Sequence, residues 1–284
     1  MAVTDQLHTS TLRPGTFEKC LRLFVTTIIP WEAACEAMRA SGIGERVAED
    51  IVAQGGNVVI GDVNGDLGRK LSSRLGATKA KFVELDVSRS SDCKQAVEAA
   101  QAAFGGLDFL VNCAITMNAK PLIELSEAGW RKTLDVGLTR TFLMSQVFAA
   151  YLVLEKRPGA IVNISSIGGQ HPYGGAGPYS TVKAGIVLLT EQMAIEWAQY
   201  GIRVNAVAPG TIETPLTAYL RDPEIRESRR EAVPLGRIGQ PADISNGILY
   251  LLSDAASWVT ATTLTIDGGV TRSLFNYMKG RKWT

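Results

Sequence analysis

Residues 42–62 read GIGERVAEDIVAQGGNVVIGD. After two glycines, the apolar residues of the first half recur with helical spacing, and the second half is a β-branched run that ends at Asp62. A helix followed, after a glycine break, by a nearly continuous apolar strand is typical of a parallel sheet covered by helices on both faces. This stretch therefore predicts an α/β fold.

The same alternation continues through most of the chain. We expect strands near 57–62, 81–86, 107–112, 160–165, 202–207 and 263–266, and helices near 44–54, 65–75, 91–104, 126–156, 179–199 and 242–253. Strands that alternate with helices predict a doubly wound parallel sheet, or Rossmann fold, in a three-layer αβα arrangement. No shift of composition marks a linker, so the 284 residues are expected to form a single domain.

The composition argues against several classes of protein. Hydrophobic residues make up 46% of the chain, which is enough for a large core. The 29 basic and 28 acidic residues are scattered, so no nucleic-acid partner is expected. Four separated cysteines and two histidines offer little to a metal site, and the apolar stretch from Leu21 to Trp31 is too short to span a membrane. We expect a cytoplasmic protein with reduced thiols and no metal.

Gly42 and Asp62 have the spacing of a dinucleotide site. Glycines at the start of a helix let the backbone approach a pyrophosphate, which the helix N-terminus favours. A carboxylate about 20 residues further on can accept both ribose hydroxyls of NAD and would repel the extra phosphate of NADP. The pattern by itself is weak, because Gly-x-Gly pairs are common and an aspartate after a strand often only caps a turn.

Ser166, Tyr179 and Lys183 form a candidate reactive group. Tyr179 and Lys183 lie at i and i+4 and therefore on one face of a helix, where the ammonium would favour phenolate and lower the tyrosine pKa. Ser166 follows an apolar strand, so its hydroxyl can donate a hydrogen bond to a carbonyl oxygen on which charge develops. Taken singly, each has an ordinary alternative: exposed helix neighbours, or a serine that ends a strand.

Taken together, these residues resemble the short-chain dehydrogenase/reductase family over roughly residues 41–270. The matching elements, in the family's order, are Ser41 to Gly44, Asp62, Asp86 with Val87, Asn112 to Ala114, Ser166, Tyr179 to Lys183, Pro209 with Gly210, and Asp267 to Gly269. The resemblance implies an NAD(H)-dependent enzyme that interconverts a secondary alcohol and a ketone. It also implies a homodimer or homotetramer joined through the two long helices near 126–156 and 179–199.

The resemblance also implies a role for each site residue. Tyr179 would be the acid/base, Ser166 would orient the substrate oxygen, and Lys183 would hold the nicotinamide ribose. The expected cofactor contacts are Gly42, Ile43, Gly44, Asp62, Asp86, Val87, Asn112, Ala114, Tyr179, Lys183, Pro209, Gly210, Ile212 and Thr214. Of these, Asn112 and Ala114 would line the adenosine side, and the group from Pro209 to Thr214 would contact the nicotinamide.

Three features depart from the family pattern. The first glycine of the phosphate turn is replaced by Met38, and the nearest strand-like run, from Leu23 to Thr27, comes about eleven residues too early. Residues 1–40 are therefore expected to be an atypical N-terminal segment containing a possible first strand, ahead of a catalytic domain at 41–284. Ile115 stands where the family has a glycine, and Gly137 stands where the long helix normally carries the asparagine of a proton relay.

These departures leave two functions open. One is a working enzyme with an altered relay, and the other is a weakened or non-catalytic homologue that acts through binding or assembly. The loop from Gly168 to Pro178 and the segment from Thr211 to Leu235 are expected to line the pocket of a moderately apolar carbonyl compound. Within that segment, Leu216 to Leu235 is either a lid over the substrate or a solvated helical hairpin.

Overall fold

The computed structural model describes residues 22–26, 42–62, 64–85 and 90–273. Asp86 and Val87, two of the expected cofactor contacts, lie outside the described residues. The phosphate turn before Gly42 lies outside them as well.

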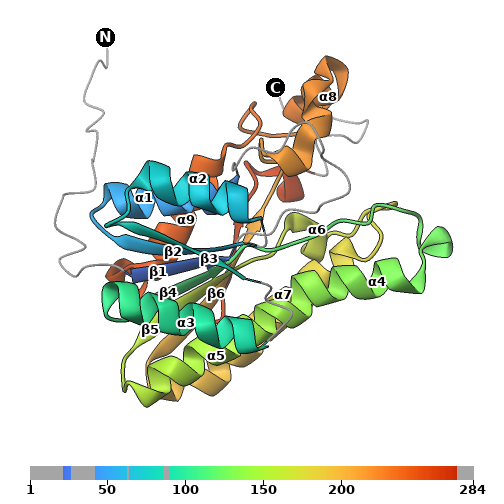
Figure 1. Cartoon of the computed structure of the whole chain (residues 1–284). Coiled ribbons are helices and arrows are strands. Elements are labelled where there is room, and N and C mark those ends of the chain that lie inside the picture. Colours follow the sequence, from blue (N-terminus) through green and yellow to red (C-terminus); the bar gives the residue numbers. More distant parts are fainter. Residues whose placement is uncertain (1–21, 27–41, 63, 86–89, 274–284) are drawn as a thin grey trace, which may run out of the picture.

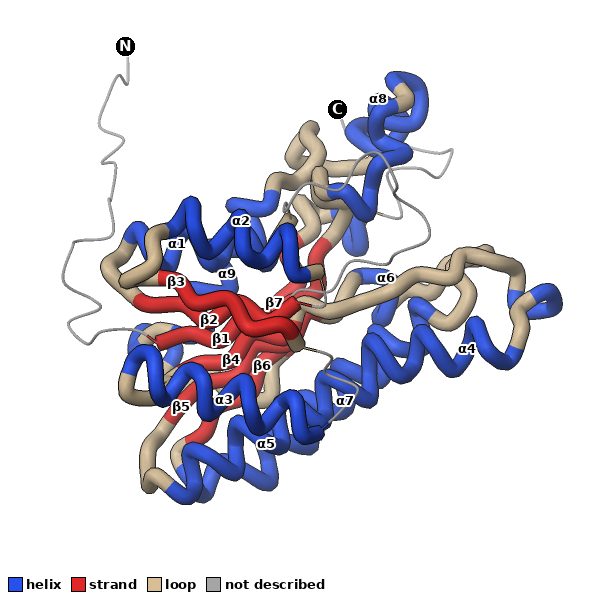
Figure 2. The backbone as a smooth tube through the Cα atoms, in the orientation of Figure 1, coloured by secondary structure: helices blue, strands red, loops and turns tan. Residues whose placement is uncertain are grey.

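Seven parallel strands form one sheet in the order β3-β2-β1-β4-β5-β6-β7 (Figure 2). The strands are β1 (Arg22–Thr26), β2 (Asn57–Asp62), β3 (Ala80–Glu84), β4 (Phe109–Asn112), β5 (Gly159–Ile164), β6 (Ile202–Pro209) and β7 (Thr263–Ile266). The order reverses direction beside β1, and ligands of open α/β sheets bind at the carboxyl ends of the strands next to such a reversal. The doubly wound, single-domain fold expected from the sequence is confirmed.

Helices cover both faces of the sheet (Figure 1). One face carries α1 (Ile43–Ala53), α2 (Gly65–Leu75) and α9 (Pro241–Leu252), and the other carries α3 (Ser90–Phe104), α5 (Arg140–Leu154) and α7 (Tyr179–Trp197). Two apolar clusters fill the spaces between the layers, with Val47, Ile60 and Ile248 in one and Met144, Phe148 and Ile161 in the other. Strands buried on both faces explain the continuous apolar runs in the sequence.

The strand-like run near residue 23 is β1, at the centre of the sheet. It pairs in parallel with β2 and with β4, so that Val25 lies opposite Ile60 on one side and Val111 on the other. A strand with two partners has its backbone groups satisfied on both edges. The early position of this run in the sequence therefore did not prevent it from taking the central place in the sheet.

Several predicted boundaries shift in the structure. The strand expected from residue 107 begins at Phe109, and the helix expected over 126–156 consists of α4 (Glu127–Leu134), a π-helical turn (Asp135–Thr139) and α5. Ser126 caps α4 by accepting a hydrogen bond from the backbone N–H of Gly129 at 3.1 Å. A π-helical turn inserts an extra residue into a helix and is frequent at functional sites.

Helices also occupy the segment that interrupts the alternation. A 3₁₀ helix (Pro215–Arg221) leads to α8 (Pro223–Glu231), which begins where Asp222 accepts hydrogen bonds from two backbone N–H groups. No residue of α8 is buried, and Figure 1 shows α8, in orange, standing away from the sheet. The helical character agrees with both readings of this segment, and whether it moves over a substrate stays a prediction.

The helical run Glu127–Leu154 is long and apolar enough, by length and composition, to cross a membrane. Its apolar residues have another explanation, because Met144, Phe148 and Leu152 are fully buried against the sheet and neighbouring helices. Core helices of globular proteins satisfy the same criterion. The expectation of no membrane association stays a prediction.

Candidate active site

The end of β5 brings the three candidate reactive residues together. Ser166 follows the strand and begins the short helix α6 (Ile167–Gln170), where its hydroxyl accepts a hydrogen bond from the backbone N–H of Gly168 at 3.0 Å. The same hydroxyl is hydrogen-bonded to Tyr179, the first residue of α7. Its neighbour Ser165 points the other way and donates to the carbonyl oxygen of Lys183 at 2.8 Å. Of the two serines, only Ser166 therefore contacts the tyrosine.

Lys183 is a buried cation beneath this pair. Its side chain is almost wholly enclosed, and its ammonium Nζ donates to the carbonyl oxygen of Ile164 at 2.6 Å. Nζ lies 5.7 Å from the centre of the Tyr179 ring. The helical spacing therefore places the two side chains together as expected, and one backbone carbonyl of β5 fixes the position of the charge.

Burial controls the pKa values in this group. Desolvation raises the pKa of Tyr179 to about 12, and the hydrogen bond with Ser166 only partly opposes it. Desolvation likewise lowers the pKa of Lys183 to about 8 and raises that of the neighbouring Cys113 thiol to about 12. The expectation that Lys183 gives the tyrosine a lowered pKa is wrong for the protein alone, because removal of phenolate from water costs more than the nearby charge returns. Tyr179 is a neutral phenol.

A buried polar network supports the strands under the site. The Asn112 amide donates to Asn163 Oδ1 at 2.8 Å and to Ser145 Oγ at 2.9 Å, and the Asn163 amide donates to Thr190 Oγ1 at 2.9 Å. These contacts join β4, β5, α5 and α7. The amide nitrogen of Asn112 is directed into this network, and the expected contact of Asn112 with the adenosine side of a cofactor stays a prediction. Asn163, a lone polar residue in an apolar strand, was missed by the sequence analysis.

The residues described on the adenosine side fit a dinucleotide. Gly42 precedes α1 with φ of 132°, a conformation that favours glycine, and a Cβ there would meet nothing within 4 Å. No side-chain cap satisfies the N–H groups at this end of α1 among the described residues, so they can receive an anion. Ile43 and Gly44 form the first turn, and Ala114 is buried just beyond β4.

Asp62 is buried at the carboxyl end of β2, where a ribose would be recognised. Its Oδ1 accepts a hydrogen bond from the backbone N–H of Asn64 at 2.8 Å, which is the turn-capping role considered as the alternative. A carboxylate has two oxygens and several acceptor positions, so this cap is compatible with a ribose contact.

On the nicotinamide side, Pro209 ends β6, and Gly210 lies against the turn after β7. A Cβ at Gly210 would come within 2.8 Å of the Asp267 backbone, so only glycine fits at this contact. The Asp267 carboxylate accepts from the backbone N–H groups of Gly269 and Thr271 at 2.9 and 2.7 Å, which fixes that turn. The close approach aligns the ends of β6 and β7.

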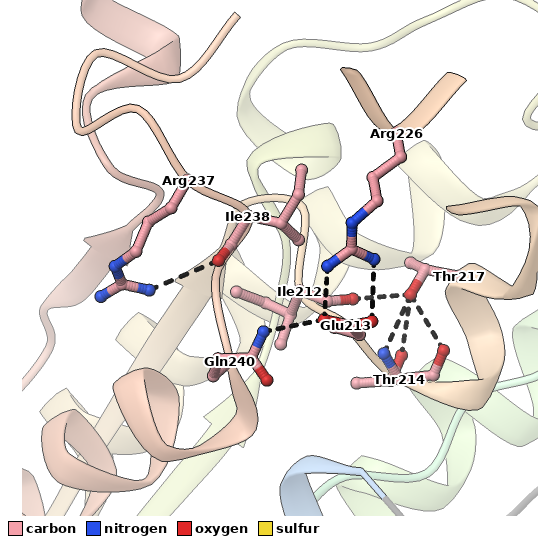
Figure 3. A network of polar contacts seen from close by, with 8 residues as sticks. All are labelled: Ile212, Glu213, Thr214, Thr217, Arg226, Arg237, Ile238 and Gln240. Carbon is pink, nitrogen blue, oxygen red and sulfur yellow. Dashed lines mark hydrogen bonds and ion pairs between the residues drawn. The ribbon is translucent and has the colours of Figure 1, made fainter. Parts of the chain in front are cut away.

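A polar network anchors α8 beside Ile212 and Thr214 (Figure 3). Arg226 of α8 donates to both oxygens of Glu213, at 2.8 and 3.0 Å, and the amide of Gln240 donates to the same carboxylate at 2.9 Å. These hydrogen bonds lower the pKa of Glu213 to about 2. The segment expected to cover the substrate is thus tied to the loop that holds two expected nicotinamide contacts.

The two unusual residues Gly137 and Ile115 contact each other. A Cβ at Gly137, inside the π-helical turn, would lie 2.4 Å from Val182 Cγ1 and 2.8 Å from Ile115 Cδ1. Ile115 is buried in an apolar cluster that includes Tyr179 and Val182. An asparagine at 137 therefore does not fit beside these side chains. The two departures from the family pattern are therefore linked: Ile115 packs in the space that a side chain at position 137 would need.

Comparisons with known proteins agree with this geometry. A family model described as enoyl-(acyl carrier protein) reductase matches residues 37–271. The chain belongs to the short-chain dehydrogenase/reductase family. A cis-4-hydroxycyclohexanecarboxylate dehydrogenase of Sinomonas cyclohexanicum is 39% identical over 236 residues, which cover 82% of this chain and 93% of the relative. A 3beta-hydroxysteroid dehydrogenase of Eggerthella lenta is 37% identical, with 82% and 90% covered.

Solved structures of the short-chain dehydrogenase/reductase family are also similar. A 3-ketoacyl-(acyl-carrier-protein) reductase from Brucella melitensis, complexed with NADH, has a TM-score of 0.78 at 28% identity, with 88% of this chain and 98% of that chain covered. A short-chain type dehydrogenase/reductase from Mycobacterium ulcerans has a TM-score of 0.79 at 30% identity, with 88% and 89% covered. Membership makes this chain a dehydrogenase or reductase homologue.

Gly137→Ala is expected to destabilise the protein by about 1–3 kcal/mol, because the added methyl overpacks Val182. A loss of stability would be informative, since alanine in place of glycine within a helix normally raises the free energy of unfolding by up to about 1 kcal/mol. In a Val182→Ala background the cost should shrink. The control is Gly185→Ala, whose Cβ would meet only the end of the flexible Leu138 side chain, at 3.0 Å. Urea unfolding measures all four variants, and a stabilising Gly137→Ala would contradict the packing argument.

Lys183→Met is expected to raise the free energy of unfolding near pH 7, by about 3 kcal/mol at most. The pKa of Lys183 is lowered from 10.5 to about 8, so below about pH 8 the folded protein holds an unfavourable buried charge. Between these pKa values the unfolded chain binds more protons, and wild-type stability rises with pH. The difference in the free energy of unfolding between variant and wild type, measured by urea unfolding, should therefore decrease from about pH 8 to 10. A difference independent of pH would contradict the lowered pKa of Lys183.

Proposed function

We propose that this protein is an NAD(H)-dependent oxidoreductase that interconverts a secondary alcohol and a ketone. One observation carries the proposal: the Tyr179 hydroxyl is hydrogen-bonded to Ser166, and the buried ammonium of Lys183 lies 5.7 Å from the centre of the Tyr179 ring, at the carboxyl edge of the sheet. Membership of a family of dehydrogenases and reductases supports the same reaction class. A cytoplasmic location is part of the proposal, on the separated, reduced cysteines.

Each residue has a role set by its environment. As a neutral phenol, Tyr179 donates a proton to the carbonyl oxygen when a ketone is reduced, and it accepts the hydroxyl proton when an alcohol is oxidised. Ser166 donates a hydrogen bond to the same oxygen while charge develops on it. Lys183 holds a positive charge under the tyrosine, which favours phenolate once a proton leaves. The nicotinamide cofactor supplies or accepts the hydride.

NAD(H) rather than NADP(H) is proposed on the position of Asp62. A carboxylate at the end of β2 suits the two ribose hydroxyls and repels a phosphate on the same sugar. The expected contacts of Gly42, Ile43, Gly44, Ala114, Pro209, Gly210, Ile212 and Thr214 belong to this proposal. Asn112 is proposed as a support for these residues, because its amide serves the buried network.

A cyclic secondary alcohol is the substrate class that we favour. The relatives include dehydrogenases named for a hydroxycyclohexanecarboxylate, a 3beta-hydroxysteroid and a 2,5-dichloro-2,5-cyclohexadiene-1,4-diol. Their names share a hydroxyl group on a six-membered carbon ring. Two further tyrosines, Tyr173 and Tyr219, are close enough to act on the pKa of Tyr179, and their rings suit the apolar face of such a ring.

A homodimer or homotetramer is proposed on the outer faces of the long helices. Leu188 and Ile195 of α7 are 67% and 76% exposed, and Leu154 at the end of α5 is 79% exposed. Leu188 and Ile195 are seven residues apart and so lie on one face of α7, and exposed apolar helix faces are a mark of association surfaces. A second copy of this chain, presenting the same two helices, would cover them symmetrically.

The non-catalytic alternative rests on Gly137 and Ile115. An isoleucine packed at the relay position places apolar atoms where a proton path to solvent would be expected. The acid/base group itself lacks none of its three side chains. Catalysis with a modified proton path is therefore the better account of the site, and turnover decides between the two.

Tyr179→Phe is expected to lower kcat by a factor of about 100 to 10,000, which is the usual contribution of a positioned acid/base. The substitution keeps the ring and removes only the hydroxyl, so the fold and cofactor binding should persist. Formation of NADH from cyclic alcohols, followed by absorbance, measures the loss, and quenching of protein fluorescence measures NADH binding. Wild-type protein that binds NADH but converts no alcohol or ketone of a broad panel would favour the non-catalytic alternative.

Asp62→Asn is expected to reduce the preference for NAD over NADP about tenfold or more, because it removes the charge that repels the 2′-phosphate. The amide oxygen keeps an acceptor for the Asn64 backbone, so the turn should be preserved. The ratio of kcat/KM for the two cofactors measures the effect. An unchanged ratio would limit Asp62 to capping the turn.

A further inference from the structure

Two tyrosine rings meet over a glycine next to the reactive group. A Cβ at Gly168 would lie 3.0 Å from Tyr173 Cε1 and 3.4 Å from both Tyr179 Cε1 and Ser166 Oγ. Tyr173 is half exposed, whereas Tyr179 is buried. Tyr173 therefore contacts the surroundings of the reactive hydroxyls at Gly168 and also reaches solvent.

Tyr219 of the 3₁₀ helix Pro215–Arg221 belongs to the same group. It is close enough that its charge would raise the pKa of Tyr173 and of Tyr179. The guanidinium of Arg229, on α8, lies 5.8 Å from the centre of the Tyr219 ring, and it acts on the pKa of Tyr173 in the opposite direction. Arg229 therefore lies near Tyr219, which together with Tyr173 is within electrostatic range of Tyr179.

Arg229 differs from the two other arginines of α8. Glu213 binds Arg226 through both oxygens, and Glu227 binds Arg230 one turn away. Among the residues that the structure describes, no carboxylate pairs with Arg229, whose guanidinium lies near the face of the Tyr219 ring. A guanidinium near the face of an aromatic ring can still present its planar N–H groups to a carboxylate.

We propose that Arg229 recognises the carboxylate of a cyclic hydroxy acid or keto acid. The carbon that bears the hydroxyl would lie at Tyr179 and Ser166, the ring would contact Tyr173 and Tyr219, and the carboxylate would pair with Arg229. This inference rests on the proposed function and names its substrate class. Arg229 would be a specificity residue, since it would contact the carboxylate and not the carbon that bears the hydroxyl.

The test compares one substrate with and without its charge. The probes are cis-4-hydroxycyclohexanecarboxylate and its methyl ester, with wild type, Arg229→Gln, Arg229→Lys and the matched control Arg230→Gln. For Arg229→Gln, kcat/KM on the acid should fall about five- to tenfold, mainly through KM, and remain unchanged on the ester. Arg229→Lys should retain part of the preference, Arg230→Gln should retain all of it, and added salt should weaken it.

Other results would overturn the proposal while leaving the proposed function intact. An equal fall of kcat/KM on the acid and on the ester would mean that Arg229 only supports α8. An unchanged kcat/KM on both would mean that Arg229 does not recognise the carboxylate.

Calorimetry with cyclohexanecarboxylate, with and without NADH, separates this inference from catalysis. If no alcohol is turned over, the proposed function fails, but binding of the acid that weakens in Arg229→Gln would still support the anion site. Absence of binding to wild type would overturn it.

Discussion

The site depends on one buried hydrogen bond, from the Lys183 ammonium to the carbonyl oxygen of Ile164 at 2.6 Å. An ammonium removed from water is unfavourable unless strong acceptors surround it, and the last carbonyl of β5 is such an acceptor. Ser165 returns a hydrogen bond from the strand end to the carbonyl oxygen of Lys183. The start of α7 is therefore fixed to β5 at two points, and Tyr179 and Ser166 inherit their relative position from this attachment. Burial at this position makes the charged form of Lys183 less favourable than in water, and its pKa is therefore lowered to about 8.

The sequence was sufficient for the fold because each strand is a short apolar run between helices. Val58 to Ile60 and Ile161 to Val162 are buried by helices on both sides, and this double burial produces the pattern that reveals them. Element boundaries were less accurate, since the end of a helix depends on tertiary contacts such as those that produce the π-helical turn at Asp135–Thr139. The central strand, β1, is separated from Gly42 by more residues than the family pattern allows. The spacing between strand and glycines therefore could not identify it as the first strand of the sheet.

The candidate site was predictable where function requires a particular side chain at a fixed spacing. Ser166, Tyr179 and Lys183 are such residues, and the structure places them together. The sequence could not reveal the direction of the Tyr179 pKa shift, because burial, not spacing, determines it. It also could not reveal that Ile115 and Gly137, 22 positions apart, occupy one volume. In the sequence they look like the separate loss of a glycine and of an asparagine. In the structure, the lack of a side chain at Gly137 makes room for Ile115.

Helix α8, the proposed outer boundary of the site, differs from the core of the protein in the residues that hold it in place. No residue of α8 is buried, and the helix is joined to the body by the exposed ion pair of Arg226 with Glu213, a carboxylate that Gln240 also contacts. Residues of this kind can be exchanged with little effect on folding, because they displace no core atoms. On the proposed role of α8 beside the substrate, selection could alter which compounds are admitted by changing α8 while the sheet, the lysine and the tyrosine stay as they are. Such an arrangement would separate the evolution of substrate range from the preservation of chemistry.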